Sequence, residues 1–284
     1  MGTTKIEWTE STWNPVSGCT KVSPGCANCY AERMAKRLKA MGTPGYEDGF
    51  AVTLHPNRLA DPLRWKKPRM IFVGSMGDLF HEDVPDEFIW QVIETAYQAK
   101  QHVFQILTKR PERMRDVLTR SAWWNNDTPP NIWLGTSTEN QETANERIPH
   151  LLDCPAAVRF VSAEPLLGPV NLAEYLSCDC VAAGRAGWEP GPVQQRELCQ
   201  ACGGFPFRDS IDWVIVGGES GPGARPMKPD WVRSIRDECQ AAGVSFFMKQ
   251  MGGYPSKRAA IRDIPTDLQI REMPVAADAA GGEA

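Results

Sequence analysis

Three cysteines near the start of the chain, Cys19, Cys26 and Cys29, are the residues best placed for chemistry. Their segment also carries Pro24 and Gly25, and these residue types favour tight turns that bring the sulfurs of one short loop together. Clustered thiolates bind soft metals, and three of them leave a tetrahedral or cubane centre one ligand short. The spacing therefore predicts a metal centre with an open coordination position. A structural zinc site with a distant fourth ligand and three unconnected thiols are the alternatives.

A second group of cysteines lies later in the chain, where Cys178 and Cys180 precede Cys199 and Cys202. Four thiolates close a tetrahedral site, which is the arrangement of structural zinc. The sequence between them is rich in glycine and proline and poor in core residues, so a bound metal would keep it ordered. We expect residues 170–210 to form a cysteine-rich, zinc-stapled insert. An auxiliary iron–sulfur cluster and unrelated thiols are the alternatives.

The composition is that of a globular protein, because 42% of the 284 residues are hydrophobic, 23% are charged and the net charge is −4. No apolar run is long enough for a membrane span, and the first residues lack the apolar core of a signal peptide. We therefore expect a cytoplasmic protein without membrane contact, where nine cysteines favour metal ligation over disulfides. One basic stretch, residues 58–69, surrounds Trp65 and could hold a phosphate backbone and stack a base, although a solvated loop has the same composition.

Short apolar runs alternate with amphipathic segments along most of the chain, which is typical of a parallel sheet covered by helices. The runs predict a strand before Cys19 and further strands at 70–73, 103–107, 131–134, 158–161, 212–216 and 244–248. Helices are predicted at 31–40, 85–100, 111–118, 141–152 and 229–242. This alternation favours an α/β fold, a (β/α) barrel or partial barrel built from residues 1–169 and 211–260, over a doubly wound sheet. We expect the tail, residues 266–284, to be partly disordered.

Charged residues follow the predicted strands at the ends where a barrel builds its active site. They are Asp78, Glu139, Glu164, Glu219, Lys109 and Lys249. A single acidic residue in such a position usually caps the following helix. Because all of these residues follow parallel strands, they would point into one mouth, and we predict a site there.

With these features together, the chain resembles a bacteriophage and prophage protein family of unassigned function that is known for a three-cysteine motif. The likeness spans most of residues 4–255. It is carried by Trp-Asn-Pro-x-x-Gly-Cys at 13–19, Cys-Ala-Asn-Cys-Tyr-Ala at 26–31, Gly-Asp-Leu-Phe-His at 77–81 and Val-Gly-Gly-Glu-Ser-Gly at 216–221.

More distantly, the chain is similar to the radical S-adenosylmethionine enzymes, in which three cysteines after the first barrel strand hold a four-iron cluster. This resemblance implies that Cys19, Cys26 and Cys29 bind a 4Fe-4S cluster whose open iron is chelated by S-adenosylmethionine. It also implies cofactor contacts, with Asp78 at the methionine amino group, Ser137 and Glu139 at the ribose, and Gly217, Gly218 and Glu219 at the adenine. The chain departs from those enzymes in having six residues between the first two cysteines instead of three, and in having Asn28 where an aromatic residue is usual.

The resemblance implies an enzyme that uses one electron to cleave S-adenosylmethionine and abstract hydrogen from a substrate. We expect Lys109, Glu164 and Lys249 to be catalytic, and Lys109, Arg110 and Lys249 to hold an anionic group of the substrate. A flavodoxin or ferredoxin is the expected electron donor, and a nucleotide or nucleic acid the expected substrate. The main alternative is a zinc-stabilised nucleic-acid-binding protein without catalysis. A barrel hydrolase with zinc on the first three cysteines is another, although only four histidines are present to support it.

Overall fold

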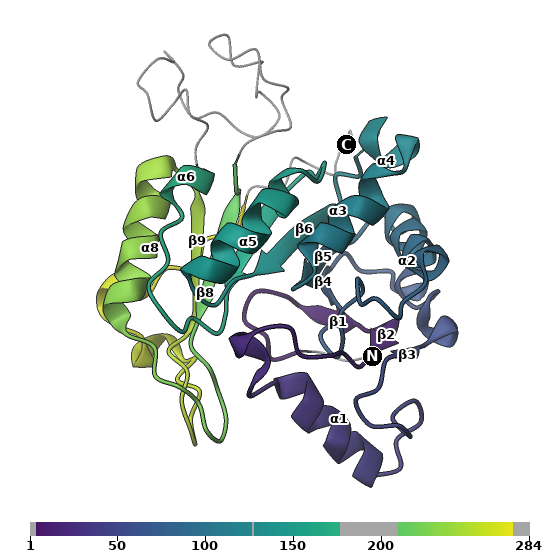
Figure 1. Ribbon diagram of the computed structural model, residues 1–284, viewed down its shortest axis with the longest axis horizontal. Helices are drawn as coiled ribbons and strands as arrows, with labels where there is room; N and C mark the ends of the chain where they lie inside the picture. The colour runs from purple at the N-terminus through teal and green to yellow at the C-terminus, as the bar shows by residue number, and fades with distance from the viewer. Residues whose placement is uncertain (1–3, 127, 177–209, 275–284) are drawn as a thin grey trace.

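A seven-stranded parallel sheet, curved into half of a barrel, forms the centre of the computed structural model (Figure 1). The structure describes residues 4–126, 128–176 and 210–274. The strands lie side by side in chain order, from one edge to the other: β1 (Ser11–Trp13), β4 (Met70–Val73), β5 (Val103–Thr108), β6 (Ile132–Ser137), β7 (Arg159–Ala163), β8 (Trp213–Gly217) and β9 (Ser245–Gln250). The prediction of a partial (β/α) barrel is confirmed.

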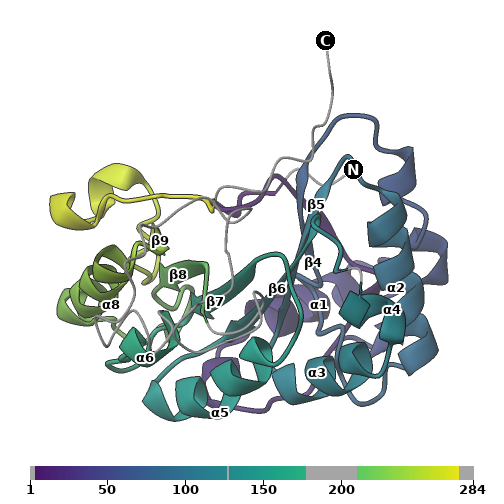
Figure 2. The same ribbon diagram turned by 90° about the horizontal axis from the view of Figure 1, so that it is seen from above.

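The helices between these strands cover the outer, convex face of the sheet (Figure 2). Their apolar sides follow the spacing seen in the sequence, so the predicted helices occur with small shifts at their ends. They are α2 (Asp86–Gln98), α3 (Pro111–Thr119), α5 (Gln141–Leu152) and α8 (Pro229–Ala242), with the shorter α4 (Ala122–Asn126) and α6 (Ala173–Leu176). Within the described ranges, no helix has the length and apolarity needed to cross a membrane.

Aromatic side chains fill the inner, concave face of the half-barrel. Trp133, Phe160, Trp213 and Phe247 from successive strands form one buried cluster together with Trp8, which precedes β1. Gly135 makes this packing possible, because a Cβ atom there would lie 2.5 Å from the ring of Phe160, its register partner on β7. Among the described residues, the concave face is therefore a packed interior.

Segments at both ends of the chain pack beside the last strand. Lys257 Nζ lies 2.7 Å from Glu7 Oε1, and this ion pair joins the chain after β9 to the chain before β1. The amide of Met248 donates to the carbonyl of Ile270, and the indole of Trp213 donates to the carbonyl of Glu272. The described chain thus stays packed beyond residue 260.

One helix lies apart from the others. Helix α1 (Tyr30–Ala40) buries only Ala35 fully and packs with Tyr46 and Met76, beside the end of the sheet toward which the strands run. The predicted zinc ligands Cys178, Cys180, Cys199 and Cys202 and most of the predicted insert lie in 177–209, outside the described residues, as do the last residues, 275–284.

Candidate functional site

The three N-terminal cysteines lie in residues 18–30, which we call the cysteine loop. It begins after β2 (Val16–Ser17), which pairs with β3 (Thr53–Leu54). At Gly18 the backbone has φ +86°, and a Cβ atom would lie 2.1 Å from the carbonyl oxygen of Ala51, so only glycine fits here. The turn sets the direction in which Cys19 leaves the sheet. A single 3-10 turn, η1 (Pro24–Cys26), then carries Cys26, and Cys29 immediately precedes α1.

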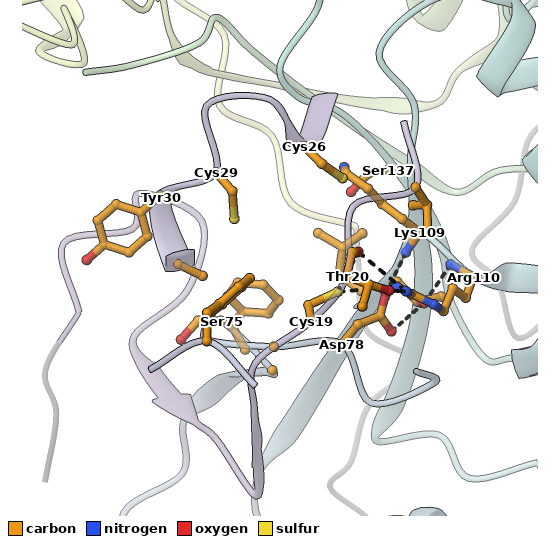
Figure 3. A pocket seen from close by; sticks show the side chains of 18 residues that line it. Cys19, Thr20, Cys26, Cys29, Tyr30, Ser75, Asp78, Lys109, Arg110 and Ser137 are labelled. Atoms are coloured by element: carbon orange, nitrogen blue, oxygen red, sulfur yellow. Dashed lines mark hydrogen bonds and ion pairs between the residues drawn. The ribbon is translucent and has the colours of Figure 1, made fainter. Parts of the chain in front are cut away.

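All three cysteines line one cavity of about 230 Å³ at the carboxyl edge of the sheet, where the strands end (Figure 3). They are partly exposed free thiols. Phe72 and Leu107 provide apolar wall, and the polar lining includes Asp78, Lys109, Arg110 and Ser137 from the ends of β4, β5 and β6. The structure thus brings together the cysteines and four of the other residues predicted for the site.

The thiols surround the cavity without meeting at one point. Across residues 4–126, 128–176 and 210–274, no three His, Cys, Asp or Glu side chains are grouped closely enough to hold a metal ion. In Figure 3 the sulfur atoms of Cys19, Cys26 and Cys29 approach the cavity from different sides of the cysteine loop. The arrangement therefore leaves space between the sulfurs.

Arg110 connects Cys19 to the sheet. Its Nη1 donates to Cys19 Sγ at 3.2 Å and to Asp78 Oδ2 at 3.4 Å, while its Nη2 donates to the hydroxyl of Thr20 at 2.7 Å. Burial and the neighbouring Asp78 carboxylate raise the pKa of the Cys19 thiol to about 11, although Arg110 acts in the opposite direction. In the metal-free protein Cys19 is therefore a neutral thiol at pH 7.

Asp78 is fully engaged by its neighbours. Its Oδ1 accepts from the amide of Phe80 and from the hydroxyl of Thr108, and its Oδ2 accepts from the amide of Lys109 and from Arg110. A carboxylate has about four acceptor positions, so these four bonds use its capacity. Asp78 positions the chain after β4 and β5 and, through Arg110, the first cysteine.

Glu139 holds the middle of the cysteine loop. Its Oε1 accepts from the amide of Gly25 at 3.2 Å, and its Oε2 is paired with Arg147 Nη1 at 3.0 Å. Glu139 is completely buried and Arg147 almost so, and Arg147 also donates to the carbonyl of Ser137. The pair therefore fixes the end of β6 and the turn that carries Cys26.

Glu219 holds the last part of the cysteine loop. Asn28 Nδ2 donates to Glu219 Oε2 at 2.9 Å, and Arg225 donates to the same carboxylate through its backbone amide, Nε and Nη2. Arg225 also donates to the carbonyl of Pro24. Burial disfavours the charged carboxylate, but the hydrogen bonds from Arg225 and Asn28 outweigh burial and lower the pKa of Glu219 to about 2.

Glu164 and Lys249 form a separate pair outside the cavity lining. Lys249 Nζ lies 2.7 and 2.8 Å from the two oxygens of Glu164. Gly217 allows this approach, because a Cβ atom there would lie 3.1 Å from the Glu164 carboxyl carbon. Gly218 accepts from Gln250 Nε2 through its carbonyl oxygen. These predicted site residues are brought to the same edge of the sheet, at the ends of β7, β8 and β9.

A family model described as a protein of unknown function (DUF5131) matches residues 3–281. The chain belongs to the DUF5131 family. No curated protein and no solved structure matches it. The match covers the whole half-barrel and the cysteine loop, and its description assigns no activity to either.

Several partners in the site were not predicted as functional residues. Arg147 lies within α5 and Arg225 within the long connection after β8, and nothing in their local sequence pointed to a buried carboxylate. Asn28 stands where the radical enzymes usually have an aromatic residue. Its contact with Glu219 shows that this departure contributes to holding the cysteine loop.

The basic stretch at 58–69 has internal contacts in this DUF5131 chain. Trp65 is half-buried, with its ring centroid 6.0 Å from that of His102 and 5.8 Å from the guanidinium carbon of Arg69. Arg69 also donates to Ser11. Trp65 therefore contributes to packing around the sheet, while Lys66 and Lys67 are exposed.

Proposed function

We propose that this DUF5131 protein is an iron–sulfur enzyme of the radical S-adenosylmethionine type, with Cys19, Cys26 and Cys29 as the cluster ligands. The observation that carries the proposal is that these three thiols line one cavity at the carboxyl edge of a parallel half-barrel. Enzymes with (β/α) folds build their active sites at this edge. Three protein ligands leave one coordination position for a small molecule, which a purely structural site does not need.

The contacts that anchor the cysteine loop support a cluster site that is preorganised before the cluster binds. Carboxylates from the ends of β4, β6 and β8 hold it at three places: Asp78 through Arg110, Glu139 at Gly25, and Glu219 at Asn28. Opening a buried charged contact leaves a costly unpaired group, so contacts of this kind oppose movement of the loop. A preorganised loop would place the three sulfurs where they can bind one cluster.

A four-iron cluster does not require the three sulfurs to group around one point. Sulfurs bound to one zinc ion lie about 4 Å from one another, because each Zn–S bond is about 2.3 Å. In a four-iron cluster every cysteine binds its own iron, so the sulfurs stand further apart. Thiols that surround a cavity without grouping around one point fit the second arrangement.

Held by Cys19, Cys26 and Cys29, such a cluster would supply the single electron that cleaves S-adenosylmethionine and so allows hydrogen abstraction from a substrate. The residues of this chain would orient and shield that chemistry. Arg110 would hold the sulfur of Cys19 and moderate its negative charge. Phe72 and Leu107 would keep water from the cavity wall. Because their oxygens are already engaged, Asp78, Glu139 and Glu219 would position the cysteine loop more than they would contact S-adenosylmethionine.

The test is the metal content and cofactor cleavage of anaerobically purified protein. We expect iron and acid-labile sulfide in the wild type, and production of 5′-deoxyadenosine from S-adenosylmethionine after addition of dithionite. Cys19→Ala should lose the iron and the product, while Cys239→Ala, a buried thiol of the outer core, should keep both. A Cys19→Ala protein with a full complement of iron and sulfide would overturn the assignment of the ligands.

A further inference from the structure

Lys109 is the cation of the cavity whose charge is not already engaged. Its backbone amide donates to Asp78, but within the described part of the chain no hydrogen bond or ion pair involves Nζ. The other cations near the strand ends are occupied. Arg110 binds Cys19, Asp78 and Glu82, and Lys249 binds both oxygens of Glu164.

Ser137 provides a second free donor on the neighbouring strand. Its side chain lines the cavity although the residue is only 5% exposed, and its hydroxyl has no partner among the described residues. Thr108 and Thr136 are register partners on β5 and β6, so Lys109 and Ser137 follow them side by side at the edge of the sheet. Figure 3 shows both side chains on the part of the cavity next to Cys26.

The remaining polar lining offers little to a cationic ligand. Asp78 is the acidic residue that lines the cavity, and four donors already use its oxygens. The hydroxyl of Thr20 contacts Arg110 and His81, and that of Ser75 donates to Asn14. Among the lining side chains other than the thiols, the ammonium of Lys109 and the hydroxyl of Ser137 remain available to a ligand, since the hydroxyl of Tyr30 points away from the cavity in Figure 3. Lys109 is partly exposed, and its ammonium group lines the cavity without a counter-ion among the described residues, so it can form a charge-assisted hydrogen bond with a bound anion.

We propose that Lys109 and Ser137 form a binding site for the anionic group, a carboxylate or phosphate, of a small molecule that binds beside the three cysteines. Lys109 Nζ supplies the charge and Ser137 Oγ a hydrogen bond. One source of the anion is the carboxylate of S-adenosylmethionine, and for this source the inference rests on the proposed function. The other source is an anionic group of the substrate. Of the three cations expected from the sequence to hold an anion, Lys109 alone is free to do so.

The test is calorimetric titration of the full-length, anaerobically purified protein with three probes: S-adenosylmethionine, its decarboxylated analogue and inorganic phosphate. Lys109→Gln, Ser137→Ala and Lys109→Arg are compared with the wild type. Lys67→Gln, which removes an equal charge at an exposed position outside the cavity, is the matched control. Iron and sulfide are counted in each sample, and circular dichroism verifies folding.

Loss of one charge-assisted hydrogen bond should weaken binding of the relevant anion roughly 10- to 100-fold in Lys109→Gln, less in Ser137→Ala, and little in Lys109→Arg. If S-adenosylmethionine loses affinity while its decarboxylated analogue does not, the site takes that carboxylate. If phosphate alone loses affinity, the site takes a substrate anion.

Equal losses in Lys109→Gln and Lys67→Gln, or no loss for either anion, would overturn the proposal. So would a Lys109→Gln protein whose defect is lost iron with unchanged anion binding, because Lys109 would then serve the cluster. Failure of the proposed function has a different signature, since a wild type without iron can still bind phosphate through Lys109.

Discussion

The substitution Glu219→Gln tests most directly whether the Glu219 carboxylate holds the cysteine loop in place. The residue is 6% exposed and accepts four hydrogen bonds, one from Asn28 and three from Arg225. Glutamine keeps the shape but removes the negative charge, and its amide nitrogen faces donors instead of accepting from them. The cysteine loop should lose its attachment at Asn28, next to Cys29.

The size of the effect follows from the lowered pKa of Glu219. A folded-state pKa of about 2, against 4.5 for a free glutamate, corresponds to on the order of 3 kcal/mol of stability at pH 7. Because the folded-state pKa is the lower one, this contribution is complete above pH 4.5 and is lost as the pH falls toward 2. At pH 3 roughly 1.5 kcal/mol should remain.

The assay is urea unfolding of the metal-free wild type and metal-free Glu219→Gln at pH 7 and at pH 3, with the iron content of the anaerobically purified proteins measured separately at neutral pH. We expect the difference in free energy of unfolding to shrink by about half between the two pH values. Glu146→Gln, on an exposed part of α5, is the control and should stay within about 0.5 kcal/mol of the wild type at both. An equal Glu219→Gln difference at both pH values would refute the role of the charge, and undiminished iron would refute its role in holding the cysteine loop.

Three further outcomes are expected. In metal-free protein at pH 8, roughly one Cys19 thiol in a thousand should be ionised, so iodoacetamide should label it slowly, as peptide mass spectrometry would measure. Asp78→Asn should speed that labelling, because the carboxylate raises the pKa of Cys19; a slower reaction would contradict this. Gly135→Ala should cost about 1–3 kcal/mol in urea unfolding, because its methyl group would press on the ring of Phe160, and an unchanged midpoint would contradict the packing described.

The sheet was predictable because its strands are buried on both faces. Runs such as Met70–Val73 and Val103–Thr108 are apolar almost throughout, and the helices between them carry apolar residues at helical spacing. The half-barrel itself was less accessible to sequence reasoning, since the inner packing depends on contacts between distant segments. Trp8 and Phe247 are far apart in the chain, and the sequence around each of them does not indicate that it packs on the concave face.

The sequence predicted which residues lie in the candidate site better than it predicted what each of them does there. The cysteines and strand-end residues could be located because parallel strands bring their carboxyl ends to one edge. Their roles depended on partners that leave no local signal. Arg147 lies eight residues after Glu139 inside a helix, and Arg225 reaches back to Glu219 from an irregular segment. These contacts show that both glutamates hold the cysteine loop, and their predicted contacts with S-adenosylmethionine stay predictions.

The most direct test of the account is electron paramagnetic resonance of anaerobically purified, dithionite-reduced protein, with and without S-adenosylmethionine. We predict a signal from a reduced four-iron cluster that changes when S-adenosylmethionine is added and is absent from Cys19→Ala. Zinc bound to the cysteine loop with no reducible iron, even after reconstitution with iron and sulfide, would contradict the account and favour a zinc-stabilised binding protein.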